Sequence, residues 1–77
     1  MQIKVKVDNT YHDGTITKTH TAQVPQAPTH DDLEEWVEEN LWPLTGTGRN
    51  DDYACYEVEI IGCDDQPFLV GKKFEWG

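Results

Sequence analysis

The chain of 77 residues contains no serine, two cysteines and no apolar run long enough to cross a membrane. The absence of serine excludes a serine nucleophile, and a membrane-spanning helix would need about 20 mostly apolar residues. Met1 is followed at once by residues 2–4, which read as the start of a strand. We therefore expect neither a signal peptide nor a membrane partner.

Cysteine is too sparse to build a disulfide framework. Cys55 and Cys63 fall in one expected strand, where a rise of ~3.3 Å per residue would place them roughly 26 Å apart, too far for a disulfide bond. No basic residue lies beside either cysteine in the sequence to activate it as a nucleophile. This pattern fits a reduced, cytosolic chain.

Basic residues are also scarce. Six Lys and Arg stand against 15 Asp and Glu, which gives a formal net charge of −9. Direct binding of nucleic acid through a basic patch is excluded, because phosphate contacts need many Lys and Arg side chains. The acidic surface has two interpretations: it keeps a small protein soluble, or it faces a protein partner with a basic surface.

No motif for a cofactor or a metal is present. His12, His20 and His30 are scattered and do not have the spacing of zinc ligands. The stretch LTGTGRND at 44–51 follows an expected helix and precedes a strand, whereas a phosphate-binding loop precedes a helix. We interpret its glycines as a connector and predict no cofactor and no metal site.

The N-terminal segment predicts a β-hairpin. Apolar and polar residues alternate on both sides of Asp13-Gly14, a favoured two-residue turn. A turn at this position pairs Ile3 with Val24, Val5 with Ala22, and Tyr11 with Ile16 on one mostly apolar face. The threonines at 15, 17, 19 and 21 then share the opposite face. A slip of one residue would mix the two faces.

Residues 30–41 are predicted to form an amphipathic helix with Thr29 as its N-cap and Pro43 as its stop signal. Leu33, Trp36, Val37 and Leu41 form one apolar stripe. The remaining circumference is acidic and carries Asp31, Asp32, Glu34, Glu35, Glu38 and Glu39. Acids near the C-terminal end of a helix oppose its dipole, so helix stability alone would not select Glu38 and Glu39.

A second hairpin is expected over residues 52–76, with a three-residue loop at 64–66. This loop pairs Ile60 with Val70, Val58 with Lys72, Glu57 with Lys73, and Ile61 with Leu69. The predicted fold class is α+β: a single domain, residues 1–77, in the order β-β-α-β-β, with a four-stranded, mainly antiparallel sheet and one acidic helix on one face. The strand order does not follow from the sequence.

The acidic helix face carries the strongest functional signal. Six carboxylates along about 18 Å of helix resemble a phosphate backbone in charge density and could compete for a groove that holds nucleic acid. The alternative is an ordinary solvated helix face. Trp42 points away from the apolar stripe by helical angle, so it is either an exposed anchor beside the acids or a ring that folds back into the core.

The stretch LEEWVEENLWPLTGTG at 33–48 resembles a segment of short proteins from phages and other bacterial mobile elements. There, an acidic helix ending in an aromatic residue and Pro leads to a T-G-x-G turn and a Tyr-rich strand. The length, acidity and sheet-plus-helix pattern also resemble phage-encoded inhibitors of bacterial defence, including anti-CRISPR proteins. The resemblance implies a non-enzymatic protein that binds and blocks a large nucleic-acid-handling machine, and it carries over no individual binding residue.

The sequence therefore predicts a binding protein whose partner is a CRISPR effector or another host nucleic-acid-binding complex with a basic surface. The predicted partner-binding residues are Asp31, Glu34, Glu35, Glu38, Glu39, Trp42 and Tyr11. One alternative is a homodimeric structural or accessory protein that pairs through the open face of its sheet. A third interpretation is a small enzyme that uses Cys55 or Cys63.

Overall fold

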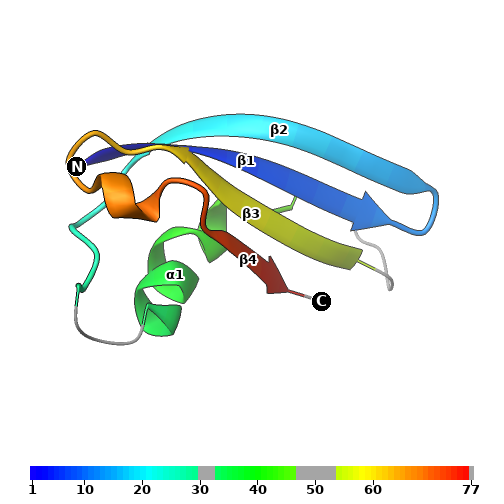
Figure 1. Cartoon of the computed structure of the whole chain (residues 1–77). Helices are drawn as coiled ribbons and strands as arrows, with labels where there is room; N and C mark the ends of the chain where they lie inside the picture. The colour runs from blue at the N-terminus through cyan, green and yellow to red at the C-terminus, as the bar shows by residue number, and fades with distance from the viewer. Residues whose placement is uncertain (30–32, 47–53, 77) are drawn as a thin grey trace.

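The computed structural model describes residues 1–29, 33–46 and 54–76. Four strands form one antiparallel sheet: β1 (Gln2–Tyr11), β2 (Gly14–Gln23), β3 (Ala54–Gly62) and β4 (Lys73–Trp76). Their spatial order is β2-β1-β3-β4, and the α-helix of the described residues, α1 (Glu34–Asn40), lies against one face (Figure 1). This arrangement confirms the predicted α+β fold.

The strand order explains why the helix lies across the sheet. Strands β2 and β3 both pair antiparallel with β1, so they run parallel to each other on either side of it. Two parallel strands require a crossover connection, usually a helical one. The segment that contains α1 makes this crossover beneath the sheet (Figure 1). Strands β2 and β4 are left as the two edges of the sheet.

The first hairpin has the predicted faces but a different register. Ile3 pairs with Ala22 and Tyr11 with Gly14, so each partner lies two residues before the predicted one. The turn consists of residues 12 and 13, and Gly14 follows with a φ of 146°, a conformation that favours glycine. Because side chains alternate with a period of two, this shift leaves every side chain on its predicted face.

The second hairpin is also displaced by two residues. Val58 pairs with Phe74 and Glu59 pairs with Lys73, so the predicted pairs are wrong. The loop prediction fails because a 3₁₀ helix, η2 (Pro67–Leu69), occupies part of the connection between the strands. This turn directs Leu69 into the core, where it is fully buried, and not onto the open sheet face.

Helix α1 is shorter than predicted. It begins at Glu34 with Leu33 at the N-cap position, and no side chain caps it, so Thr29 is not its N-cap. Residues 30–32, predicted as its first turn, lie outside the described residues. The helix ends before Pro43, as predicted, and a 3₁₀ helix, η1 (Trp42–Leu44), continues the chain. A helix of about two turns depends on tertiary packing for its stability.

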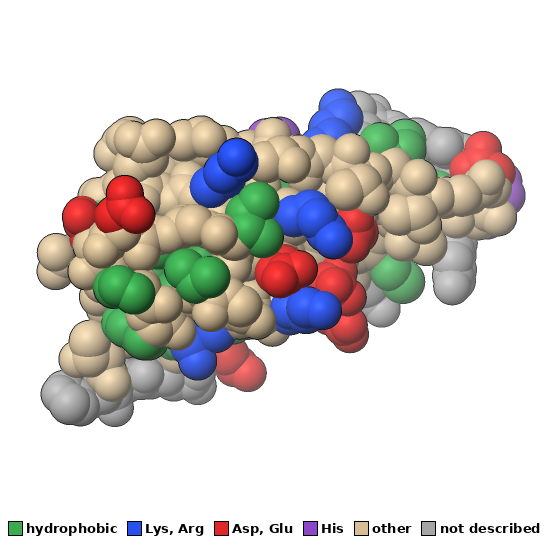
Figure 2. Space-filling view, turned by 45° about the horizontal axis from the view of Figure 1, so that its top comes forward, with side chains coloured by type: hydrophobic (Ala, Val, Ile, Leu, Met, Phe, Trp, Pro, Cys, Tyr) green, Lys and Arg blue, Asp and Glu red, His purple; other side chains and the backbone are tan. Residues whose placement is uncertain are grey.

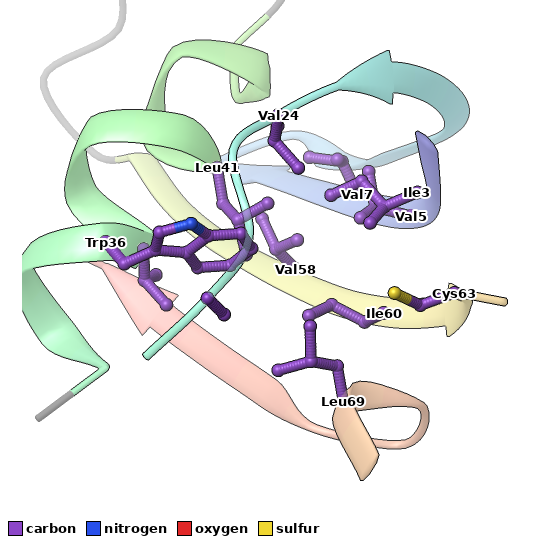
Figure 3. Packing of buried hydrophobic residues seen from close by; sticks show 12 residues of the cluster. Ile3, Val5, Val7, Val24, Trp36, Leu41, Val58, Ile60, Cys63 and Leu69 are labelled. Carbon is purple, nitrogen blue, oxygen red and sulfur yellow. The ribbon is translucent and has the colours of Figure 1, made fainter. Parts of the chain in front are cut away.

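The core fills the space between the sheet and α1 (Figure 3). Its buried residues are Ile3, Val5, Val7, Val24, Ala27, Trp36, Val37, Leu41, Val58, Ile60, Cys63 and Leu69. The indole Nε1 of Trp36 donates a hydrogen bond of 3.1 Å to the carbonyl oxygen of Pro25. The predicted apolar stripe of the helix therefore faces the sheet, and its largest ring is also tied to the segment after β2.

An irregularity in the pairing of β1 with β3 brings Cys63 into the core. Val5 faces Ile60, but Lys4 faces Gly62, which leaves Ile61 as an extra residue. A bulged residue reverses the alternation of the side chains that follow it. Ile61 is accordingly 39% exposed and Cys63 only 5% exposed.

Two side-chain amides tie the loops to the sheet. Asn9 is fully buried; its Nδ2 donates to the carbonyl oxygen of Ile16 (3.2 Å), and its Oδ1 accepts from the backbone N–H of Gly46 (2.7 Å). Gln66 pairs with the backbone of Ala27 through both its Oε1 (2.8 Å) and its Nε2 (3.0 Å). The bonds of Gln66 hold the segment before the helix, and the bond from Asn9 to Gly46 holds the segment after it.

Candidate functional site

The acidic side chains of α1 project into solvent. Glu34, Glu35, Glu38 and Glu39 are all exposed, whereas Trp36 and Val37 are buried. We call these four glutamates the acidic face. The predicted acidic surface is therefore present over the described helix, and Asp31 lies outside the described residues.

The acidic face has two sides. Glu34 and Glu38 are four residues apart, so they lie one turn above each other on the same side of the helix. Glu35 and Glu39 form a second pair about 100° further around the axis. Of these two pairs, Glu34 and Glu38 line a groove.

The groove lies between α1 and β4 and has a volume of about 410 Å³. Val37, Phe74 and Trp76 contribute its apolar part. Its charged residues are Glu34, Glu38, Lys73 and Glu75. Lys73 and Glu75 border the groove, but their side chains alternate with the core-facing ones of β4 and point to the other sheet face. Glu34 and Glu38 therefore supply the negative rim of this apolar groove. We call it the α1–β4 groove.

An aromatic cluster stands at the end of this groove. The ring of Trp42 lies 5.4 Å from that of Trp76 and 5.6 Å from that of Tyr56, at interplanar angles of 60° and 78°. Edge-to-face contacts of this kind hold rings in a defined orientation. Trp42 is nevertheless 43% exposed. Of the two interpretations of Trp42, the structure supports the exposed ring, which also rests on two aromatic neighbours.

Tyr11 is not available as a second anchor. It is only 2% exposed, because it is the last of the alternate β1 residues that share the buried face with Val7 and Asn9. This burial corrects the sequence-based prediction for Tyr11. Sequence reasoning in turn missed Phe74, Glu75 and Trp76, because the position of β4 beside α1 depends on the strand order. No local pattern in the sequence places these three residues beside the helix.

The sheet face opposite α1 carries charges of both signs (Figure 2). Lys6 faces Glu59, which in turn faces Lys73. The neighbouring row consists of Asp8, Glu57 and Glu75. The first row is mixed and the second is wholly acidic, so this face, unlike the exposed part of α1, combines basic and acidic side chains. The exposed apolar side chains near the β3–β4 end are Ile61, Phe68 and Val70.

A second cavity, of about 500 Å³, opens beside the start of β1 and the end of β3. It is lined by Gln2, Ile3, Lys4, Thr21, Gln23, Gly62, Cys63, Asp64 and Asp65. The thiol of Cys63 is buried and donates to Met1 Sδ at 3.8 Å. Within the described parts of the chain, no group of three or more His, Cys, Asp and Glu residues could hold a metal ion.

Comparisons with known proteins add no family to this description. No protein-family model, curated protein or solved structure matches the chain. The resemblance to anti-CRISPR proteins therefore stays a prediction. None of the helices in residues 1–29, 33–46 and 54–76 has the length and apolar character of a membrane span.

Proposed function

We propose that this protein acts by binding, and that the acidic face of α1 docks on a surface of a partner protein that is rich in Lys and Arg. The observation that supports this most is the combination of four exposed glutamates, an apolar groove beside them and a half-exposed Trp42 at its end. Charge speeds association with a basic surface, and a supported aromatic ring in an apolar setting supplies affinity.

The charge density of the acidic face suits a surface that normally holds nucleic acid. The four glutamates occupy about 7.5 Å of helix axis, or one charge in about 2 Å. Double-stranded DNA carries one charge per ~1.7 Å of its axis. The described helix is short, so this likeness covers a few phosphates and no long stretch of backbone.

The partner class follows from the sequence resemblance and from charge. A host nucleic-acid-handling complex, such as a CRISPR effector in the bacterial cytoplasm, presents basic grooves of the required kind. The protein itself would not bind nucleic acid, since its net charge is −9. In this proposal the protein is a non-enzymatic inhibitor that occupies the basic surface and blocks the nucleic acid.

The direct test is capture of the partner from a lysate of the bacterial host, followed by mass spectrometry. The triple variant E35K/E38K/E39K should capture none of the protein that the wild type retains, while its circular dichroism spectrum stays unchanged. Equal capture by the folded variant would contradict the proposal, because these residues supply most of the acidic face.

One observation favours a second candidate, a homodimer through the open sheet face. Ile61, Phe68 and Val70 are large apolar residues that are 39%, 48% and 48% exposed. Figure 2 shows apolar side chains gathered at one end of this face. Sedimentation velocity at tens of micromolar distinguishes the two candidates, because a strict monomer excludes the dimer.

A further inference from the structure

The α1–β4 groove borders a strand whose outer edge is open. β4 pairs with β3 on one side, and among the described strands none pairs with its other side. An edge strand presents unpaired N–H and C=O groups to solvent and can accept a further strand. β4 therefore offers backbone hydrogen bonds directly beside the groove.

The ladder identifies which backbone groups of β4 point outward. The N–H of Ile60 donates to the carbonyl of Lys72 at 3.0 Å. In an antiparallel pair, hydrogen-bonded and non-hydrogen-bonded residues alternate. Phe74 and Trp76, which lie two and four residues further along, therefore bond to β3. The N–H and C=O groups of Lys73 and Glu75 point to the open edge.

From this geometry we propose that the partner inserts an extended segment bearing Lys or Arg, which pairs with β4 as a fifth strand. The inference rests on the proposed function, whose basic partner it specifies. Alternate side chains of such a strand would lie over the α1–β4 groove. Basic side chains there would meet Glu34 and Glu38, and an apolar one would contact the aromatic cluster at Trp76.

Charge selects β4 over β2, the other edge of the sheet. β2 is longer, but its exposed side chains are mainly threonines together with Lys18, and the strand contains no acid to offset that lysine. On β4, Lys73 is offset by Glu75. β4 lies beside the glutamates of α1 and an apolar groove. Its four residues span about 13 Å, which matches a segment of four to six residues.

A short peptide tests this inference without knowledge of the partner. The probe is a fluorescein-labelled octapeptide of alternating Lys and Val, whose lysines share one face when it is extended. Its control has proline in place of each valine, which keeps the charge but prevents strand pairing. The alternating peptide should bind at least about tenfold more tightly by fluorescence anisotropy.

Glu75 allows a matched pair of protein variants. Glu75→Pro removes an outward N–H, whereas Glu75→Gln removes the same charge and keeps the N–H. The proline variant should bind the alternating peptide about tenfold more weakly, and the glutamine variant within about threefold of the wild type. Equal binding by both variants would overturn the inference.

Hydrogen exchange on the wild type covers the case in which the proline variant does not fold. Bound peptide should slow amide exchange at Lys73 and Glu75 more than at Phe74 and Trp76, whose N–H groups are already bonded to β3. Unchanged exchange at Lys73 and Glu75, no binding of the alternating peptide at about 1 mM, or equal binding of the two peptides would each overturn it.

The two proposals fail in different ways. If folded Glu75→Pro still captures the host partner while E35K/E38K/E39K does not, the fifth strand is wrong and the acidic docking surface stands. If the triple variant also captures the partner, the proposed function itself is wrong.

Discussion

Buried polar side chains show at the residue scale how a small core is tied to its loops. Asn9 stands where the alternation of β1 calls for an apolar residue, yet it is fully buried. Its amide bonds to Ile16 and Gly46, so it connects β2 and the segment after the helix. A buried polar group is tolerated only when its hydrogen bonds are made, and here both ends of the amide are used.

Asn9→Ala should lower the free energy of unfolding by about 2 kcal/mol, because it leaves the Gly46 N–H without its acceptor, removes the side-chain bond to the Ile16 carbonyl and opens a small cavity. Urea denaturation measures the change. Thr10→Ala is the control, since Thr10 lies on the opposite face and its hydroxyl shares an exposed hydrogen bond with that of Thr15. A loss in Asn9→Ala no larger than in the control would contradict this role.

Gln66→Glu should cost about 1–2 kcal/mol, because the new carboxylate still accepts from the Ala27 N–H but faces the Ala27 carbonyl with no donor. Gln26→Glu makes the same change in charge at an exposed position and should be nearly neutral. Thermal melts of both variants test the pair. Equal melting temperatures would contradict a stabilising role for the two hydrogen bonds between Gln66 and Ala27.

At the scale of elements, the sequence predicted which face each strand buries but not which residues pair. Both hairpins are displaced by two residues, and a displacement of two keeps the paired side chains on their faces. The faces change where the ladder is interrupted, at the bulge before Cys63 and at Leu69 in η2. The alternation of polar and apolar residues therefore carried no information that could distinguish the two registers. The turn at residues 12 and 13 and the 3₁₀ helix at Pro67–Leu69 decide the register.

One part of the candidate site could be predicted from the sequence, and the other part could not. The acids of α1 followed from helical periodicity, whereas the helical angle of Trp42 left its exposure open. The α1–β4 groove could not be predicted, because β4 lies beside α1 only as a result of the strand order β2-β1-β3-β4. Phe74 and Trp76 were assigned to a hairpin, and no local pattern places that hairpin beside the helix.

The helix dipole gives an element-scale prediction. Glu35 lies in the first turn of α1, where an acid is favourable, and Glu39 lies in the last turn, where it is not. Glu39→Lys should therefore raise the free energy of unfolding by about 0.3–1 kcal/mol, and Glu35→Lys should lower it by a similar amount. Both variants have the same net charge. Equal shifts in urea denaturation would show that the dipole is not the cause and that total charge is.

At the scale of the whole molecule, the distribution of charge matters more than its total. The acidic face is concentrated on α1, whereas the sheet face opposite mixes Lys and acids. A net charge of −9 would attract any basic protein without specificity. The proposed function requires a specific contribution. The acids beside the α1–β4 groove must raise the affinity for the partner by more than their share of the total charge.

One comparison separates the local surface from the total charge. E38K/E39K reverses two acids of α1, and D64K/D65K reverses two exposed acids of the β3–β4 connection. Each reversal adds two charges, so both variants go from −9 to −5. Affinity for the captured partner should fall at least about 100-fold in E38K/E39K and less than about fivefold in D64K/D65K. Equal losses in the two variants would contradict a specific docking surface on α1.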